Sequence, residues 1–142
     1  MKQGFTLLEL IVVLTLMGLF ISLAYPRVGR MRDGWLVGAA LTDLATFYRT
    51  SRYLGVVRGE RIRLEISADS LVALSDIDGV RVMAARPGPS YRGVYMSSSG
   101  NIVRFYPSGM GRGASNIKIV LWRGMAAGSL TTSRLGRLRL YR

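Results

Sequence analysis

Charged side chains at the two ends of this 142-residue chain are the residues best placed to do chemistry. Glu9 interrupts an apolar run over residues 5–25, and a charge in such a run asks for a partner because its burial in a membrane is costly. Four arginines gather near the other end: Arg134, Arg137, Arg139 and Arg142. Since guanidinium groups bind phosphate and carboxylate oxygens in a bidentate manner, these residues are candidates for contact with an anionic partner.

Catalysis is not expected from the remaining residue types. The chain has no His and no Cys, which removes the commonest general base, the thiol nucleophile and the soft metal ligands. Asp69 and the segment Asp76-Ile77-Asp78-Gly79 supply carboxylates, but the segment lacks the other ligands of an EF-hand and is more simply a turn. We therefore expect no enzyme activity, no cofactor and no metal site.

The charge balance is strongly basic. Twenty Lys and Arg residues stand against eight Asp and Glu, for a net charge of +12, and 18 of the basic residues are arginines. Such a balance is typical of proteins that contact nucleic acid or an anionic membrane. Arginine-rich composition also follows from a GC-rich genome, so composition alone leaves these explanations open.

The apolar run over residues 5–25 has the length of a membrane span. At 1.5 Å per residue a helix of this length reaches about 30 Å, the thickness of the hydrocarbon core of a bilayer. A secretory signal peptide is the first alternative, but the run is long, contains Glu9, and offers only Ser22-Leu23-Ala24 as a loose cleavage site. A plain single-span anchor is the second, and it explains neither Glu9 nor the Gly4-Phe5 pair.

The beginning of the chain resembles the signature of type IV pilins. A short basic leader ends in Gly4 and is followed by Phe5-Thr6-Leu7-Leu8-Glu9-Leu10. The resemblance implies cleavage after Gly4 by prepilin peptidase, N-methylation of the new amino-terminal Phe5, and retention of the helix as both membrane anchor and assembly element. It also implies that Glu9 pairs with the terminal amine of a neighbouring subunit.

A second, amphipathic helical segment is predicted to continue the membrane helix. Its apolar residues recur at steps of three and four: Val28, Met31, Trp35, Leu41, Leu44, Ala45 and Tyr48. Pro26 bends the helix without necessarily ending it, and Gly55 is the predicted stop. The predicted organisation is a leader (1–4), a transmembrane helix (5–25), an amphipathic half of the same helix (26–55) and a β-rich head (56–142).

The head is predicted to be mostly β. Alternating or β-branched residues indicate strands at 61–66, 70–74, 80–84, 91–96, 102–106, 117–122 and 135–141. Asp78-Gly79 is a hairpin signal, and glycine-rich loops are expected at 109–113 and 124–128. Short connections favour antiparallel pairing, with one sheet face on the helix. The fold class is α+β, a long amino-terminal helix packed on a small antiparallel head.

The head is similar to the carboxy-terminal half of the GspH/FimT-type minor pilins. The similarity rests on Phe105-Tyr106-Pro107-Ser108-Gly109, the strand at 117–122 and Gly136-Arg137-Leu138-Arg139-Leu140. It implies a long helix carrying two small β-sheets. GspH-like members are pseudopilins of type II secretion, whereas FimT-like members belong to type IV pilus systems and some take part in DNA uptake. The match at Gly136-Arg137-x-Arg139, flanked by Arg134 and Arg142, is of the kind linked to DNA binding in the FimT-like branch.

Two interpretations of the carboxy-terminal arginines stay open. Strand alternation places Arg137, Arg139 and Tyr141 on one face, opposite Leu138 and Leu140, so the arginines are either a solvated face or a nucleic-acid contact. For the second interpretation, Gly136 would let the backbone approach a phosphate. The loop at 109–113 precedes a strand rather than a helix, which argues against a nucleotide site.

The predicted function is structural. We expect a single-pass inner-membrane protein with a periplasmic head that is drawn into a filament, with other pilins or pseudopilins, prepilin peptidase and the inner membrane as partners. Arg27, Arg30 and Arg32 after the span would by charge alone mark the cytoplasmic side, but the pilin resemblance places them outside. A type II secretion pseudopilus is the first expectation, and a FimT-like minor pilin that binds DNA is the alternative.

Overall fold

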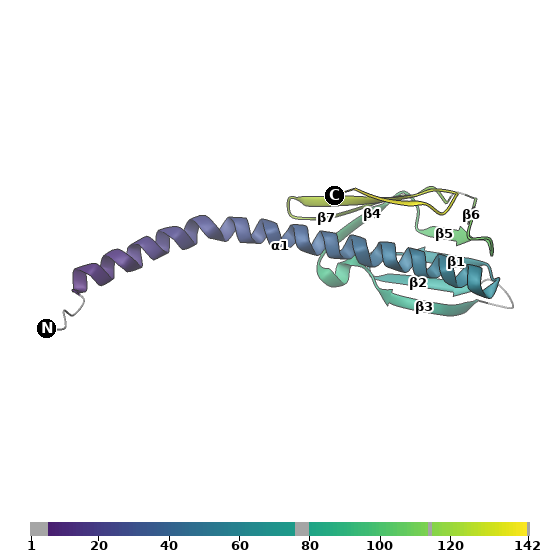
Figure 1. Ribbon diagram of the computed structural model, residues 1–142, viewed down its shortest axis with the longest axis horizontal. Coiled ribbons are helices and arrows are strands. Elements are labelled where there is room, and N and C mark those ends of the chain that lie inside the picture. Colours follow the sequence, from purple (N-terminus) through teal and green to yellow (C-terminus); the bar gives the residue numbers. More distant parts are fainter. Residues whose placement is uncertain (1–5, 76–79, 114, 142) are drawn as a thin grey trace. The chain divides into compact units, whose positions relative to one another are not determined.

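The computed structural model describes residues 6–75, 80–113 and 115–141, except for the side chains of residues 23, 24 and 26. The chain forms two compact units, residues 1–32 and 33–142. One helix, α1 (Leu7–Arg58), begins in the first unit and ends in the second (Figure 1). It continues through Pro26, so the predicted passage of the helix beyond this proline is confirmed.

Local sequence determines where α1 begins. Thr6 precedes the helix, and its Oγ1 accepts a hydrogen bond from the Glu9 backbone N at 3.3 Å. The Thr6 carbonyl oxygen accepts the first helical bond, from Leu10 N, at 3.2 Å. Thr6 and Glu9 thus occupy the N-cap and N3 positions of a capping-box sequence, which satisfies amide groups left free in the first turn.

The end of α1 differs from the prediction, because the helix passes Gly55 and continues to Arg58. Gly59 adopts a positive φ of 64°. Its N donates to the Val56 carbonyl oxygen at 3.3 Å, and Glu60 N donates to that of Gly55 at 3.1 Å. This pair of bonds is a Schellman motif. Gly55 is instead buried, since a Cβ at this position would lie 3.0 Å from Ile62 Cγ1.

The second unit contains two antiparallel sheets (Figure 1). The five-stranded sheet has the order β3-β2-β1-β5-β6, and the four-stranded sheet the order β4-β7-β8-β9. The strands are β1 (Ile62–Ile66), β2 (Ser70–Ser75), β3 (Arg81–Pro87), β4 (Tyr95–Ser98), β5 (Ile102–Phe105), β6 (Gly111–Arg112), β7 (Lys118–Arg123), β8 (Ala126–Thr132) and β9 (Leu138–Tyr141). The predicted α+β class with an antiparallel head is confirmed.

Three predicted segments of the head are different in the structure. A 3-10 helix, η1 (Pro89–Arg92), occupies the first part of the strand predicted at 91–96, because Pro89 suits a first helical turn and Gly93 ends it at a φ of 64°. The loop predicted at 124–128 contains the start of β8, and the loop at 109–113 contains β6. The hairpin predicted at Asp78-Gly79 lies outside the described residues.

Gly128 shows why β8 is not recognisable as a strand locally. It pairs with Leu121 of β7, and a Cβ on it would lie 2.5 Å from Leu41 Cδ1 of α1. The glycine therefore marks a close approach of helix and sheet rather than a loop, and tertiary pairing with β7 makes this segment a strand.

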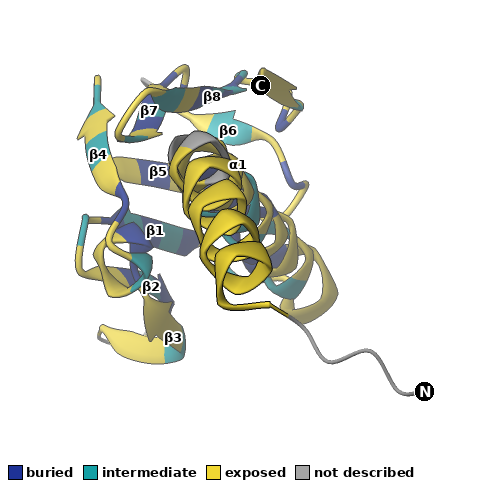
Figure 2. Ribbon diagram, turned by 90° about the vertical axis from the view of Figure 1, so that its left-hand side faces the viewer, coloured by how far each residue is buried: buried dark blue, intermediate teal, exposed yellow. Residues whose placement is uncertain are grey.

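The core of the second unit lies between α1 and the inner faces of both sheets, where Figure 2 shows buried segments. Leu41, Leu44 and Tyr48, all on the predicted apolar face of α1, are 1% exposed or less. Burial of each such side chain contributes about 1.5–3 kcal/mol to folding. Val28, Met31 and Trp35 were predicted on the same face, but they are 62%, 75% and 71% exposed. Packing against the core begins at the partly buried Leu36, and Val37 is the first buried residue.

Candidate functional site

Glu9 is the described member of the amino-terminal site, since Gly4 and Phe5 lie outside the described residues. It is exposed in the first turn of α1, where a carboxylate interacts favourably with the positive end of the helix dipole. Within residues 6–75, 80–113 and 115–141, no cation forms an ion pair with it. The carboxylate is therefore available to a partner outside this chain.

The first unit presents an apolar helix surface around this carboxylate. An 18-residue window of α1 has a mean hydropathy of 2.5, with none of it buried, and its length and composition suffice to cross a membrane. The large side chains from Leu7 to Ile21 are between 43% and 79% exposed. An apolar surface of this size needs lipid or another protein to cover it.

The carboxy-terminal arginines lie on and before the edge strand β9. Arg134, Arg137 and Arg139 are exposed, and Arg142 lies outside the described residues. Leu138 pairs with Thr132 and packs against the core, which turns the neighbouring Arg139 to the opposite face. The predicted alternation is confirmed for these positions. Leu140 is nevertheless 37% exposed, because an edge strand is covered less completely than a central one.

No negative charge compensates these arginines in the described part of the chain. None of Arg134, Arg137 and Arg139 forms an ion pair there. All eight carboxylates lie before residue 79, and residues 80–142 contain neither Asp nor Glu. Residues 80–142 therefore contribute charged side chains of one sign only, and those that carboxylates of α1 do not pair, unlike Arg92 and Arg123, attract anions over a distance set by the ionic strength.

Gly136 has a different role from the one proposed from the sequence. It is buried with a φ of 72°, and a Cβ on it would lie 2.6 Å from Arg52 Nε. Arg52 Nη1 donates to the Gly136 carbonyl oxygen at 3.2 Å, and Arg52 Nε donates to that of Gly109 at 2.7 Å. The glycine makes room for an arginine of α1, so the sequence interpretation that it admits a phosphate is wrong. Nothing in the local sequence distinguishes Arg52 from the other helix arginines.

The glycine-rich segment 109–113 uses its backbone within the fold. Besides the bond from Arg52 to Gly109, Gly111 N donates to the Arg134 carbonyl oxygen at 2.7 Å. The Arg112 guanidinium lies over the Tyr106 ring, 5.8 Å from its centroid. These contacts place Gly109, Gly111 and Arg112 within the packing of the head.

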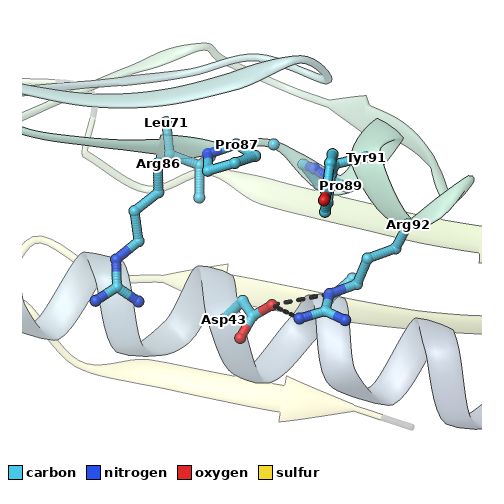
Figure 3. A pocket seen from close by; sticks show the side chains of 9 residues that line it. Asp43, Leu71, Arg86, Pro87, Pro89, Tyr91 and Arg92 are labelled. Atoms are coloured by element: carbon cyan, nitrogen blue, oxygen red, sulfur yellow. Dashed lines mark hydrogen bonds and ion pairs between the residues drawn. The ribbon is translucent and has the colours of Figure 1, made fainter.

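An ion pair between Asp43 and Arg92 lines a pocket of the second unit. The pocket has a volume of about 240 Å³ between α1, β3 and η1. Arg92 donates from Nε and Nη2 to Asp43 Oδ2 at 3.0 and 2.7 Å, while Arg86 points toward α1 from β3 (Figure 3). Both paired side chains are over a third exposed, so the pair contributes only about 0–1 kcal/mol. Among the described residues, no group of three or more His, Cys, Asp or Glu could hold a metal ion.

Tyr48 is a buried titratable group in the core. Its hydroxyl has no hydrogen-bond partner among the described residues. Burial raises the pKa of Tyr48 above its ordinary value of 10.0, and the nearby positive charge of Arg52 opposes this in part. The Tyr48 ring packs edge-on against Phe105, with centroids 5.1 Å apart. Its role is to fill the core, and it faces no site described above.

Comparisons with known proteins agree with both ends of this description. Residues 1–25 match the prokaryotic N-terminal methylation motif. Two crystal structures of the type IV minor pilin FimU from Pseudomonas aeruginosa share the fold, each with 13% sequence identity. One has a TM-score of 0.63 and covers 75% of this chain and 88% of FimU. The other has a TM-score of 0.60 and covers 74% and 92%. Among curated protein sequences, none matches significantly. The predicted leader signature and pilin-like fold are confirmed.

Proposed function

We propose that this chain is a minor pilin, a structural subunit that is anchored in the inner membrane and drawn into a filament without catalysing a reaction. The observation that carries the proposal is the apolar, unburied first part of α1 with Glu9 in its first turn. The methylation motif over residues 1–25 and the fold shared with FimU support it. Residues 56–142 would form the periplasmic head.

Assembly would use the same helix surface twice. In the membrane, lipid covers the apolar residues; in the filament, the corresponding helices of neighbouring subunits replace the lipid. Prepilin peptidase would cleave after Gly4, and the methylated amine of Phe5 in one subunit would pair with Glu9 of the next. An ion pair is strong in such an apolar environment, so it would set the register between subunits.

Replacement of Glu9 tests this mechanism. Two variants are needed, because the side chain both suits the helix cap and carries the charge. Glu9→Gln keeps a side chain that suits the N3 position of the capping box but removes the charge. Glu9→Leu removes both. We expect both variants to insert into membranes as well as the wild type does and to lose crosslinking to partner pilins.

The glutamine variant decides between the two roles of Glu9. Wild-type crosslinking by Glu9→Gln would mean that the carboxylate acts only as a helix cap, and the proposed register mechanism would then fail. Membrane fractionation of both variants provides the control, because a subunit that is not inserted cannot report on assembly.

The filament that we favour is a type IV pilus, because FimU is a type IV minor pilin. The similarity of the head to GspH supports the other candidate, a type II secretion pseudopilus, which the sequence alone placed first. The phenotype of a gene deletion distinguishes the pilus from the pseudopilus. Loss of surface pili or of DNA uptake is expected for the pilus, whereas retention of secreted proteins in the periplasm would identify the pseudopilus.

A second function, contact with DNA, is supported by the uncompensated arginines Arg134, Arg137 and Arg139. Contacts to phosphate carry no base information, so binding to duplex DNA would show little sequence preference and would weaken steeply with salt. We expect Arg137→Ala with Arg139→Ala to weaken binding by the full-length protein in detergent micelles, measured by fluorescence anisotropy at one salt concentration.

The matched control removes the same charge elsewhere in the chain. Arg49 and Arg61 are exposed, and no side-chain hydrogen bond or ion pair of either residue is found among the described residues. The variant Arg49→Ala with Arg61→Ala should keep most of the affinity. Equal losses in the two double variants would show that bulk charge alone attracts DNA, and the secretion pseudopilus would then be the better assignment.

A further inference from the structure

The outer face of the four-stranded sheet combines aromatic and basic side chains. On β7 and β8 the residues directed to the core, Ile119, Leu121 and Leu130, are 1% exposed or less. Because strand side chains alternate, the residues between them point to the opposite face. The large exposed side chains of this face, here called the aromatic face, are Tyr95, Lys118, Trp122, Arg139 and Tyr141.

Strand pairing arranges the aromatic face in rows across the sheet. Tyr95 pairs with Trp122, and their rings stack with centroids 5.9 Å apart at an angle of 26°. Two residues before Trp122 on β7, the next row runs from Val120 through Ser129 to Tyr141. The third row runs from Lys118 through Thr131 to Arg139. Aromatic rings thus lie at one end of the face and cations at the other.

A shallow hollow lies within this face. It has a volume of about 270 Å³ and is lined by Lys118, Val120, Ala127, Gly128, Ser129 and Tyr141. The small residues of β8 form part of its floor, and Tyr141 and Lys118 supply its large side chains. Tyr141 is 51% exposed and Tyr95 66% exposed, so flat surfaces remain available for stacking beside the hollow.

The charge of the face is not neutralised by the fold. Residues 80–142 contain no Asp or Glu, and no ion pair of Lys118 or Arg139 is found among the described residues. Arg123, at the end of β7, differs because its Nε contacts Asp33 Oδ1 at 2.8 Å. Lys118 and Arg139 therefore favour an anionic ligand, and the neighbouring rings favour one that carries planar groups.

We propose that the aromatic face binds single-stranded nucleic acid, with bases stacked on Tyr141 and on the Tyr95–Trp122 pair and phosphates on Lys118 and Arg139. Trp122 and Lys118 are four residues apart, about 13 Å along the strand. The four-stranded sheet of an RRM stacks two or three bases on its aromatic side chains, and we expect a similar number on the aromatic face. In a duplex the bases are already stacked on each other, so only an open strand can use the rings.

This inference rests in part on the proposed contact with DNA, to which it adds the strand form and the stacking residues. The two proposals are distinguishable because they predict that different variants lose affinity, and for different forms of DNA. The arginine proposal concerns duplex DNA and the residues Arg137 and Arg139. The aromatic face concerns single strands and depends on Lys118 and Tyr141, which the arginine proposal does not include.

Tryptophan fluorescence provides the direct test. Trp35 and Trp122 are the two tryptophans of the chain, and Trp35 is exposed on α1 outside both proposed sites. In full-length Trp35→Phe protein in detergent micelles, Trp122 is the single reporter. We expect short oligothymidylate to quench its fluorescence, and an abasic strand with the same number of phosphates to bind more weakly and quench less.

Variants then assign the binding to the face. Tyr141→Ala should weaken binding of oligothymidylate about 5- to 150-fold, the range for loss of one base–aromatic stack. Tyr141→Phe keeps the ring and should keep the affinity. Lys118→Ala should weaken binding and reduce its salt dependence. Tyr53→Ala removes an exposed ring from α1, outside the aromatic face, and should leave the affinity for oligothymidylate unchanged.

Three outcomes would overturn the inference. Equal affinity for oligothymidylate and the abasic strand would mean that charge alone binds the ligand. Tighter binding of duplex DNA than of single strands, with no quenching of Trp122, would assign the binding to the arginines instead. Unchanged affinity in Tyr141→Ala would exclude stacking on this ring, and thermal unfolding of that variant shows whether its fold is retained.

Discussion

Arg52 and Gly136, 84 residues apart in the chain, are joined by a hydrogen bond of 3.2 Å from Nη1 to the carbonyl oxygen. The Nε of the same guanidinium donates a hydrogen bond to the Gly109 carbonyl oxygen at 2.7 Å. Hydrogen bonds from a charged donor are stronger than those between neutral groups. Arg52 therefore fixes two turns to α1, and one of them leads directly into the strand that carries Arg139.

Gly136→Ala should lower the free energy of unfolding by about 1–3 kcal/mol, because it combines a left-handed backbone conformation with a clash against Arg52. Gly113→Ala is the matched control, since Gly113 has a similar φ of 67° but a Cβ added there would meet no atom within 4 Å. Denaturant unfolding of both variants separates strain from clash. An equal loss of unfolding free energy in the two variants would mean that Arg52 does not restrict position 136.

Tyr48→Phe should leave the stability unchanged or increase it near neutral pH, because the variant removes a buried hydroxyl without a partner among the described residues. The raised pKa of Tyr48 means that the folded protein keeps this proton at a pH where the unfolded chain releases it. Its contribution to stability is thus complete below about pH 10 and is lost as the pH rises further. Unfolding measured from about pH 8 to 11 should show a smaller alkaline loss in Tyr48→Phe; an identical loss would contradict the prediction.

Gly128→Ala should destabilise the head, since the new methyl group would lie 2.5 Å from Leu41 Cδ1. Leu41→Ala should cost about 2–5 kcal/mol by leaving a cavity in the core. The double variant should be more stable than the sum of the two losses predicts, because the added methyl fills part of the space vacated by the leucine. A double-mutant cycle measures this coupling, and strict additivity would exclude the contact.

Coexpression with a prepilin peptidase should remove residues 1–4 and leave Phe5 as the amino terminus. Gly4→Ala should be cleaved fully or in part, whereas a bulky residue at this position should block cleavage. Intact-mass analysis distinguishes the products. A mature protein beginning near Tyr25 would instead indicate an ordinary signal peptide and would remove the basis for filament assembly.

Segments whose signal is local were predictable from the sequence. The apolar run with Glu9 follows from composition and length, and the match over residues 1–25 agrees with it. Strand β1 was recognisable because its alternation of apolar and polar residues is the pattern of a sheet with one buried face, and the structure buries Ile62, Leu64 and Ile66 as expected. The alternation of Leu138 and Arg139 was predictable for the same reason.

Glycines were the least reliable signals, because a missing Cβ serves turns and close packing equally well. Gly55 was interpreted as a helix stop, yet it packs against Ile62, and Gly59 ends the helix. Gly128 was assigned to a loop, yet it lies in β8 beneath Leu41. Each distinction depends on what a distant part of the chain brings close, which a local pattern does not contain.

The sequence by itself thus determined the membrane-length helix, the α+β class and the basic, histidine-free surface, since these depend on composition and short periodicities. Tertiary structure decided which side chains meet. The bond between Arg52 and Gly136 and the stack of Tyr95 on Trp122 join residues far apart in the chain. Their positions follow from sheet register and helix packing, where one change of register would turn every strand side chain to the other face.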